Sequence, residues 1–159
     1  DCKFGDACQT STQIHRLSKH IKLYGNTVYH TENIRSENCP AFTMDASIGV
    51  DMDDIVVSNN TFGSHVNTVA GGENNIKIIG NHIDGIMYAN TTEHYGQGLM
   101  ICNNHINGRI NMRADNVIVS NNIINNDTAM PMARIYGNSV EINGNLGIGT
   151  GKETAIVEH

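Results

Sequence analysis

Three arginines have a type and spacing that suit the binding of an anion. Arg113 and Arg134 are 21 residues apart, and Arg109 lies shortly before them. Neighbouring guanidinium groups repel one another unless an anion lies between them, and their forked N–H donors match phosphate and carboxylate oxygens. We therefore expect Arg109, Arg113 and Arg134 to bind a phosphate, a nucleotide, a carboxylate or an acidic group of a partner chain. The alternative is a set of salt bridges within the chain, to Asp115, Asp127 or Glu141.

A second candidate group consists of the aspartates Asp51, Asp53 and Asp54. Two carboxyl groups about 5–10 Å apart can act as acid and base, or as acid and nucleophile, in the cleavage of a glycosidic bond. A paired acid and base would need two carboxylates at that distance, taken from these three aspartates and from Asp84, Glu93 and Asp115 on later coils. The alternative is that all three are ordinary solvated carboxylates.

The cysteines and histidines near the start of the chain do not form a typical metal motif. Cys2, Cys8, His15 and His20 have a wider cysteine spacing than structural zinc sites use, so no metal is predicted. Cys102 occupies a position where other parts of the chain have Ser or Gly, and we expect it to be a small stacked residue.

A short phrase recurs along the chain and indicates how these residues are positioned. Each copy has an apolar run, a small residue, an asparagine and another apolar residue, as in 99–106 and 117–124. The aligned asparagines, six in all, are Asn26, Asn60, Asn81, Asn104, Asn122 and Asn145. Most steps between them are close to the length of one solenoid coil, and the first step carries an insertion.

Each copy predicts a strand followed by a bend. In the run 76–78 the lysine is expected to point outward and the isoleucines inward. Asparagine tolerates left-handed backbone geometry, and stacked asparagines can hydrogen-bond along the solenoid axis as a ladder. A second, shorter strand is predicted in most coils, for example over 86–89 and 110–113. His82 and His105 follow aligned asparagines, and we expect them to stack at one corner.

The ends of the chain and one insert depart from the repeat. Residues 1–19 are predicted to form an N-terminal arm with a short capping helix, because Ile14, Leu17 and Ile21 follow at helical spacing after the possible N-cap Thr12. Residues 31–54 are predicted to be an irregular insert, and residues 20–156 to form the solenoid. The last residues, 157–159, look like the start of a vector-encoded tag and are left out of the fold prediction.

Composition excludes several classes of partner. With 159 residues the chain is long enough for one domain with a core. Its net charge is −6, and it has no cluster of lysines and arginines, which argues against a nucleic-acid partner. No apolar run approaches the roughly 20 residues that a membrane-spanning helix needs.

The aligned copies resemble the right-handed parallel β-helix family, which includes pectate lyases and bacteriophage tail spikes. The resemblance covers residues 20–148 and implies an all-β solenoid of about six coils with a short N-terminal capping arm. Because this fold hosts many activities, the resemblance predicts the fold more specifically than the function.

Within that family, the size of the chain and Asp1 at the start of a polar arm look most like the C-terminal maturation domain of a tail spike or pre-neck appendage protein. This implies an intramolecular chaperone for a homotrimer, released by self-cleavage before Asp1 and linked to ATP, in a virion-associated precursor made in the cytoplasm of a bacterial host. The nucleophile would be Asp1 or the residue before it, and Asp6 or His15 would be the base. Exposed methionines would face the sister chains, namely Met87, Met112, Met130 and Met132.

Two other functions stay open. The chain could be part of a polysaccharide lyase or hydrolase acting through Asp51, Asp53 and Asp54, or a sugar-binding repeat whose ligand is an acidic saccharide. It could also be a structural repeat without a ligand.

Overall fold

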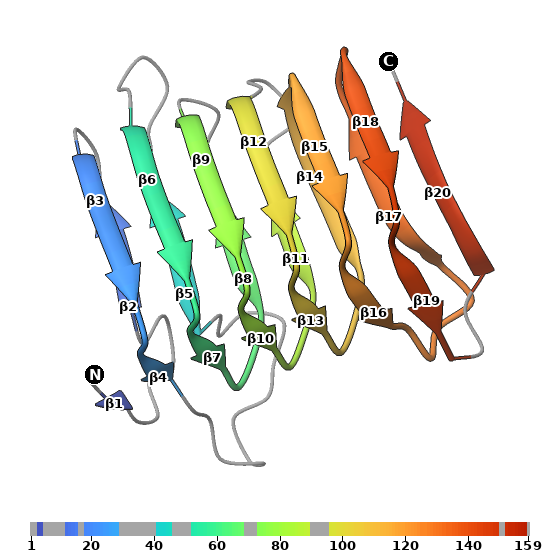
Figure 1. Ribbon diagram of the computed structural model, residues 1–159, viewed down its shortest axis with the longest axis horizontal. Coiled ribbons are helices and arrows are strands. Elements are labelled where there is room, and N and C mark those ends of the chain that lie inside the picture. The colour runs from blue at the N-terminus through green and yellow to red at the C-terminus, as the bar shows by residue number, and fades with distance from the viewer. Residues whose placement is uncertain are drawn as a thin grey trace.

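The chain folds as a right-handed parallel β-helix (Figure 1). The computed structural model describes residues 3–4, 12–15, 18–28, 41–45, 52–68, 73–89, 96–149 and 152–158. Every regular element in these ranges is a β-strand. The predicted all-β solenoid is therefore confirmed. None of the described residues belongs to a helix that could cross a membrane.

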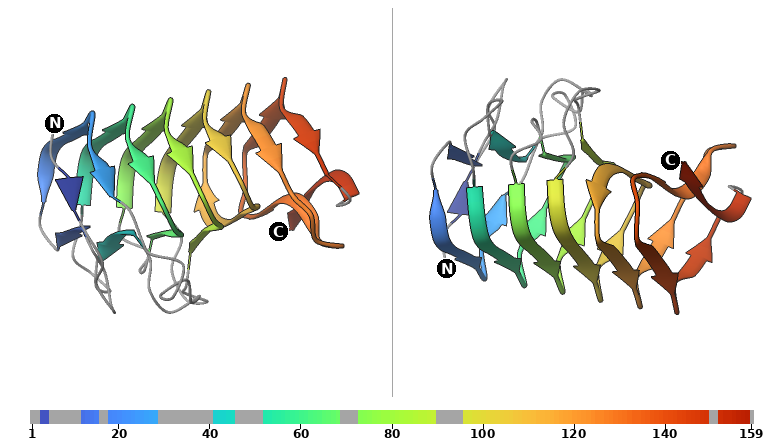
Figure 2. Two further views of the ribbon diagram at one scale, coloured as in Figure 1. Left: turned by 90° about the horizontal axis from the view of Figure 1, so that it is seen from below. Right: turned by 90° about the horizontal axis from the view of Figure 1, so that it is seen from above.

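Three parallel sheets form the sides of the solenoid, and each coil contributes one strand to each (Figure 1, Figure 2). Sheet I contains β3 (Lys19–Tyr24), β6 (Met52–Ser58), β9 (Glu73–Ile79), β12 (Gly96–Cys102), β15 (Val117–Ser120) and β18 (Val140–Asn143). Sheet II contains β1 (Lys3–Phe4), β4 (Thr27–Val28), β7 (Thr61–Phe62), β10 (His82–Ile83), β13 (His105–Ile106), β16 (Ile123–Asn125) and β19 (Leu146–Ile148). Sheet III contains β2 (Thr12–His15), β5 (Phe42–Asp45), β8 (Val66–Thr68), β11 (Met87–Ala89), β14 (Ile110–Asp115), β17 (Pro131–Tyr136) and β20 (Lys152–Glu158).

The six copies of the phrase correspond to the six strands of sheet I. About four coils are described without a gap through all three sheets, over 52–68, 73–89, 96–115 and 117–136. The first and last copies also contribute strands to the sheets, with gaps in the described residues between them. The coils described without a gap therefore number about four, against the roughly six predicted.

The core consists of rows of apolar side chains that stack from coil to coil. In sheet I, one row contains Val57, Ile78, Ile101 and Val119, all completely buried. A second row in sheet II contains Phe62, Ile83, Ile106 and Ile124, also completely buried. Burial of each such side chain stabilises the fold by about 1.5–3 kcal/mol. As predicted, Lys77 is exposed between the buried Ile76 and Ile78.

The aligned asparagines form a ladder inside the bend that follows sheet I. The Oδ1 of Asn104 accepts hydrogen bonds from the backbone N–H of Asn81, at 2.9 Å, and from its side-chain Nδ2, at 3.1 Å. The Nδ2 of Asn104 donates in turn to the Oδ1 of Asn122, at 3.0 Å, and to the carbonyl of Ile78, at 2.9 Å. The same pattern links Asn26 to Asn60 and Asn122 to Asn145. The predicted ladder is confirmed.

Left-handed backbone positions flank the apolar run of each strand of sheet I. The residue before each ladder asparagine has a positive φ, as at Asn59 (53°), Gly80 (67°) and Asn103 (57°). A second series precedes the apolar run, as at Asn75 (54°) and Gly98 (69°). Glycine and asparagine adopt this conformation at the lowest cost, which explains why they alternate in the repeated phrase.

Two predictions about the first part of the chain are wrong. The stretch expected to form a capping helix contains strands β2 and β3, and Ile14 points into the solenoid beneath Met44 of β5. The predicted irregular insert contains the regular strand β5, in which the buried Phe42 stacks on Phe62 with ring centroids 5.5 Å apart. In β2 and β5 single apolar residues stand among polar ones, which fits the strand period, but no asparagine phrase accompanies these two strands.

Candidate functional site

The three predicted arginines lie together on the outer face of sheet III. Strand alternation places Arg113 and Asn111 of β14 on that face, with Arg109 just before the strand. The register sets Arg134 of β17 opposite Asn111, and Tyr136 opposite Arg113. Arg113 and Arg134 therefore share a face but do not stack directly, because the coil step between β14 and β17 is 23 residues rather than 21. We call Arg109, Arg113 and Arg134 the arginine face.

Each of these arginines has a different environment. The guanidinium carbon of Arg113 lies 4.4 Å from the centroid of the Tyr136 ring, a cation–π contact. Arg134 Nε lies 3.5 Å from Glu158 Oε1, and Arg134 Nη1 lies 3.5 Å from the Tyr136 hydroxyl. Arg109 makes no ion pair within the described part of the chain. Among the described residues, the predicted internal partners Asp115, Asp127 and Glu141 form no salt bridge with these arginines.

Glu158 is a partner of Arg134 that the sequence does not predict, because residues 157–159 look like the start of a tag. Val157 and Glu158 belong to β20, where they pair with Ile135 and Tyr136 of β17. The register therefore brings Glu158 onto the arginine face, whatever the origin of these residues.

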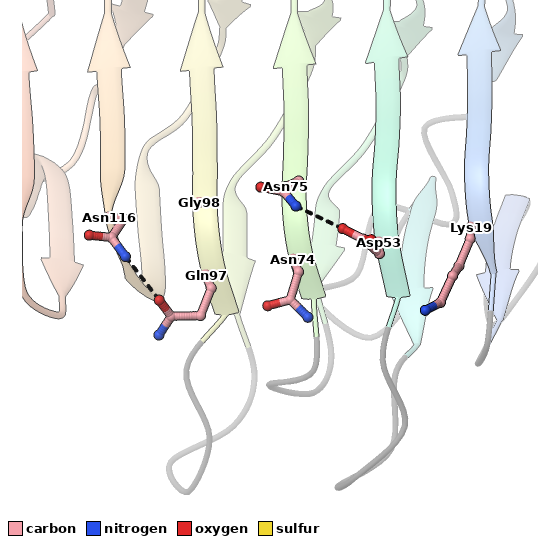
Figure 3. Close-up of a pocket in the computed structure, with 7 residues that line it drawn as sticks. All are labelled: Lys19, Asp53, Asn74, Asn75, Gln97, Gly98 and Asn116. Carbon is pink, nitrogen blue, oxygen red and sulfur yellow. Dashed lines mark hydrogen bonds between the residues drawn. The ribbon is translucent and has the colours of Figure 1, made fainter.

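A row of polar side chains lines a shallow trough at the start of the sheet I strands (Figure 3). The lining includes Lys19, Asp53, Asn74 and Gln97. Each of these stands seven residues before a ladder asparagine, and the same spacing continues the series beyond the trough to Asp115 and Asn138. We call these six residues the outer polar row. The trough has a volume of about 510 Å³ and continues into a second depression of about 400 Å³ that includes Met100 and Ile118. This row could have been found from the sequence, because its residues recur with the same spacing as the ladder asparagines.

Hydrogen bonds connect several members of the outer polar row. Asn116 Nδ2 donates to Gln97 Oε1 at 2.9 Å, and Gln97 Nε2 donates to Asp115 Oδ2 at 3.2 Å. Asp115 also accepts from the backbone N–H of Asn138 at 2.7 Å, and this bond holds the pKa of the Asp115 carboxyl below its usual value. Asn74 forms no side-chain hydrogen bond within the described ranges, so its amide is available in the trough.

Asp53 and Asp54, two of the predicted catalytic aspartates, are held by neighbours on adjacent coils. Asn75 Nδ2 donates to Asp53 Oδ1 at 2.8 Å. Asp54 Oδ2 lies 2.8 Å from His20 Nδ1, and this hydrogen bond lowers the pKa of the Asp54 carboxyl. A carboxyl group with a lowered pKa is ionised at neutral pH and suits an electrostatic or binding role better than that of a general acid.

The other predicted catalytic residues are outside the part of the chain that can be described. Asp1, Asp6 and Asp51 are outside the described residues, and so is the side chain of His15. The self-cleavage prediction therefore stays a prediction.

The positions of His82, His105 and Cys102 agree with the predictions. His82 and His105 are in register, with ring centroids 4.9 Å apart in an edge-to-face arrangement. Cys102 is buried, and its Sγ lies 3.1 Å from Ser120 Oγ in the next coil. Among residues with a described placement, no group of three or more His, Cys, Asp or Glu side chains is arranged to hold a metal ion.

An apolar row on the outer face of sheet II is a feature that the sequence reading missed. The outward column of this sheet is polar at Thr61, His82 and His105, and then becomes apolar at Ile123 and Leu146. Leu146 is 56% exposed, Ile148 beside it 50%, and Ile123 39%. We call Ile123, Leu146 and Ile148 the apolar row.

The methionines only partly match their predicted position on the surface. Met87 and Met112 are buried in the core, so for them the prediction is wrong. They occupy inward positions of sheet III, where Met87 is in register with Val66 and Ile110. Met132 is partly buried against the core, and Met130 is exposed as predicted.

Comparison with known protein families, curated proteins and solved structures finds no match to this chain. The fold is therefore defined by the strand register and the asparagine ladder of this chain itself.

Proposed function

We propose that this domain is an assembly module that brings identical chains together side by side as a homotrimer. The exposed apolar row is the observation that carries the proposal. These side chains point outward from sheet II, since Ile123 is in register with Leu146, Asn125 with Ile148, and the intervening Ile124 points into the core. Clustered exposed apolar side chains favour an interaction with another surface.

The narrowness of the row favours three-fold symmetry. The row is only two columns wide, which is a small contact for two chains that meet face to face. Around a three-fold axis parallel to the solenoid axes, each residue on the axis meets its two symmetry mates. Three copies of Ile123, Leu146 and Ile148 would then form a small apolar core on the three-fold axis, and sheets I and III of each chain would face the solvent.

Analytical ultracentrifugation with paired variants tests this proposal. The wild-type chain is expected to have three times the monomer mass across the micromolar range. The double variant Leu146→Ser, Ile148→Ser should sediment as a monomer with an unchanged circular dichroism spectrum. Tyr24→Ser is the matched control, since it removes an exposed aromatic side chain from sheet I, and its mass should be that of the wild type. A monomeric wild-type protein at high micromolar concentration contradicts the proposal.

The trough on sheet I supports a second candidate function, the binding of an extended neutral saccharide. Its polar edge contains the amides of Asn74 and Gln97, and the adjoining depression is lined by the half-buried Met100 and Ile118. Sugar hydroxyls pair with amide and carboxylate groups, while the C–H faces of sugar rings pack on apolar side chains.

The charges of the trough favour a neutral ligand. Lys19 and Lys77 balance Asp53 and Asp54, so the trough has no net charge. An acidic saccharide would gain no attraction there and would be repelled by a chain whose net charge is −6. A neutral saccharide therefore fits the trough better than the acidic saccharide expected from the resemblance.

Gly98 provides a sharp test of saccharide binding. Its missing side chain leaves a gap between Asn75 and Asn116, which occupy the equivalent left-handed positions of the adjacent coils. Gly98→Asn should fill the trough without unfolding the chain, because asparagine tolerates this backbone conformation. Cellohexaose and mannohexaose are suitable probes in ¹H–¹⁵N NMR. Shifts of the trough amides in the wild type that vanish in Gly98→Asn support the function, and shifts that survive the substitution contradict it.

A further inference from the structure

We infer that the arginine face of sheet III is a binding site for a phosphate- or sulfate-type oxyanion. This inference goes beyond the assembly function and involves a different face of the solenoid. It starts from two guanidinium nitrogens that lack an acceptor. Among buried side-chain atoms of the described residues, Arg109 Nε and Arg134 Nε have no hydrogen-bond partner.

An unpaired buried N–H of a charged group is costly to the fold. Burial of a donor without an acceptor costs about 1–3 kcal/mol, and more for a charged group. Buried polar groups are paired in the great majority of cases, so each exception requires an explanation. Two such donors on one face, both from guanidinium groups, point to an acceptor that is bound from outside the chain.

The positions of the arginines suit a single small anion. Arg109 and Arg113 are two residues to either side of Asn111 along the chain, and Arg134 lies opposite Asn111 in the next coil. Arg134 is therefore a diagonal neighbour of both, at about 7–8 Å between backbones. Long guanidinium side chains at this separation can converge on one oxyanion, to which each donates through its N–H fork.

Glu158 does not satisfy this set of donors. Its Oε1 lies 3.5 Å from Arg134 Nε, beyond the usual N–H···O hydrogen-bond range of about 2.7–3.2 Å. One carboxylate also leaves two of the three positive charges of the arginine face without compensation. Glu158 thus occupies the edge of the site as a weak internal competitor for an incoming anion.

The contact with Tyr136 prepares Arg113 for this role. The Tyr136 ring supports one face of the guanidinium plane, at 4.4 Å from the ring centroid, and leaves its N–H edge free to donate. An aromatic support restricts the rotamers of a long side chain, so less entropy is lost when the anion binds. The required ligand is therefore a compact group with several acceptor oxygens, either free or carried by a larger molecule.

Pyrophosphate and ATP are the probes that test the site, with chloride at matched ionic strength as the reference. At low salt, where screening is weak, pyrophosphate should raise the melting temperature and shift the Nε–H signals of Arg109 and Arg134 in ¹H–¹⁵N NMR. Equal affinity for both probes assigns the site to the oxyanion alone. At least tenfold tighter binding of ATP shows that a nucleoside is also recognised.

Three variants separate binding from folding. Arg109→Gln should weaken pyrophosphate binding at least tenfold, and it should not lower the unliganded melting temperature, because it removes a buried donor that has no acceptor. Lys77→Gln removes the same charge from sheet I and should bind like the wild type. Glu158→Gln should bind pyrophosphate several-fold more tightly, because the competing carboxylate is lost.

The inference is overturned if pyrophosphate acts no differently from chloride. It is also overturned if Arg109→Gln retains wild-type affinity, or if Glu158→Gln lowers stability without tightening binding. The last result would make the Arg134–Glu158 pair a structural salt bridge. All of these outcomes are independent of the mass of the wild-type assembly, so the inference can fail while the trimer proposal stands.

Discussion

Replacement of one ladder asparagine should destabilise the fold far more than replacement of its sequence neighbour. Asn104→Ala removes the acceptor of the Asn81 backbone N–H and one of the two acceptors of the Asn81 side chain. It also removes the donor to the Ile78 carbonyl. Asn104 is only 2% exposed, so water cannot easily replace these bonds. At about 1–3 kcal/mol for each buried group left unpaired, two such groups cost about 2–6 kcal/mol.

Asn103→Gly is the matched control. Asn103 is exposed and left-handed, and glycine already occupies the equivalent positions at Gly80 and Gly144. We expect its free energy of unfolding to stay within about 1 kcal/mol of the wild type.

Urea denaturation followed by circular dichroism measures both variants. With an m-value of about 1–3 kcal/mol/M, Asn104→Ala should lower the midpoint by about 1 M or more. Hydrogen exchange gives a local readout, since the Asn81 amide should lose its protection in this variant. Equal midpoints for Asn104→Ala and Asn103→Gly would refute the reasoning that the ladder stabilises the fold.

Three further results are expected from other parts of the solenoid. The pKa of the Asp54 carboxyl, measured by NMR, should lie below 3.8 and should rise toward 3.8 in His20→Ala. Because the pKa is lower in the folded state than in the unfolded state, the contact with His20 stabilises the fold above pH 3.8. This stabilisation is lost as the pH falls through the folded pKa. Gly108→Ala should lower the melting temperature by several degrees, because a Cβ there would collide with the carbonyl of Gly85 on the previous coil, and an unchanged value would contradict that packing. Cys102→Ser should unfold in urea within about 0.5 kcal/mol of the wild type, because serine occupies the aligned position of the next coil.

Sheet I and the ladder could be predicted from the repeated phrase because each position of the phrase meets a structural requirement. The asparagine must be an amide to bridge two coils, and the residue before it must tolerate a positive φ. Sheet III has no such requirement, so its strands carry no recurring phrase, and β5 was mistaken for part of an irregular insert. The spacing of Ile14 and Ile21 fits a helix as well as two strands joined by a turn, and only the pairing of β2 with β5 decides between them.

The positions of the candidate site residues relative to one another depend on the number of residues in each coil, and the sequence gives that number only approximately. The spacing of Arg113 and Arg134 placed both on one face, but the offset of two residues depends on the 23-residue step between β14 and β17. The apolar row was missed because single apolar residues such as Leu146 look the same in sequence whether they point inward or outward. The direction of such a side chain follows from the strand register. A shift of the register by one residue would turn every side chain of the strand to the opposite face.

The ladder makes the coils of this solenoid interchangeable units. Each ladder asparagine bonds mainly to its neighbours in the adjacent coils, so the interactions that join coils are pairwise and nearly identical along the axis. Excision of one whole coil would bring two asparagines of the same geometry into contact and leave the remaining rows in register. Removal or addition of a whole coil would thus change the length of the solenoid by one strand spacing, about 4.8 Å. The side chains on the surfaces near its two ends would stay the same.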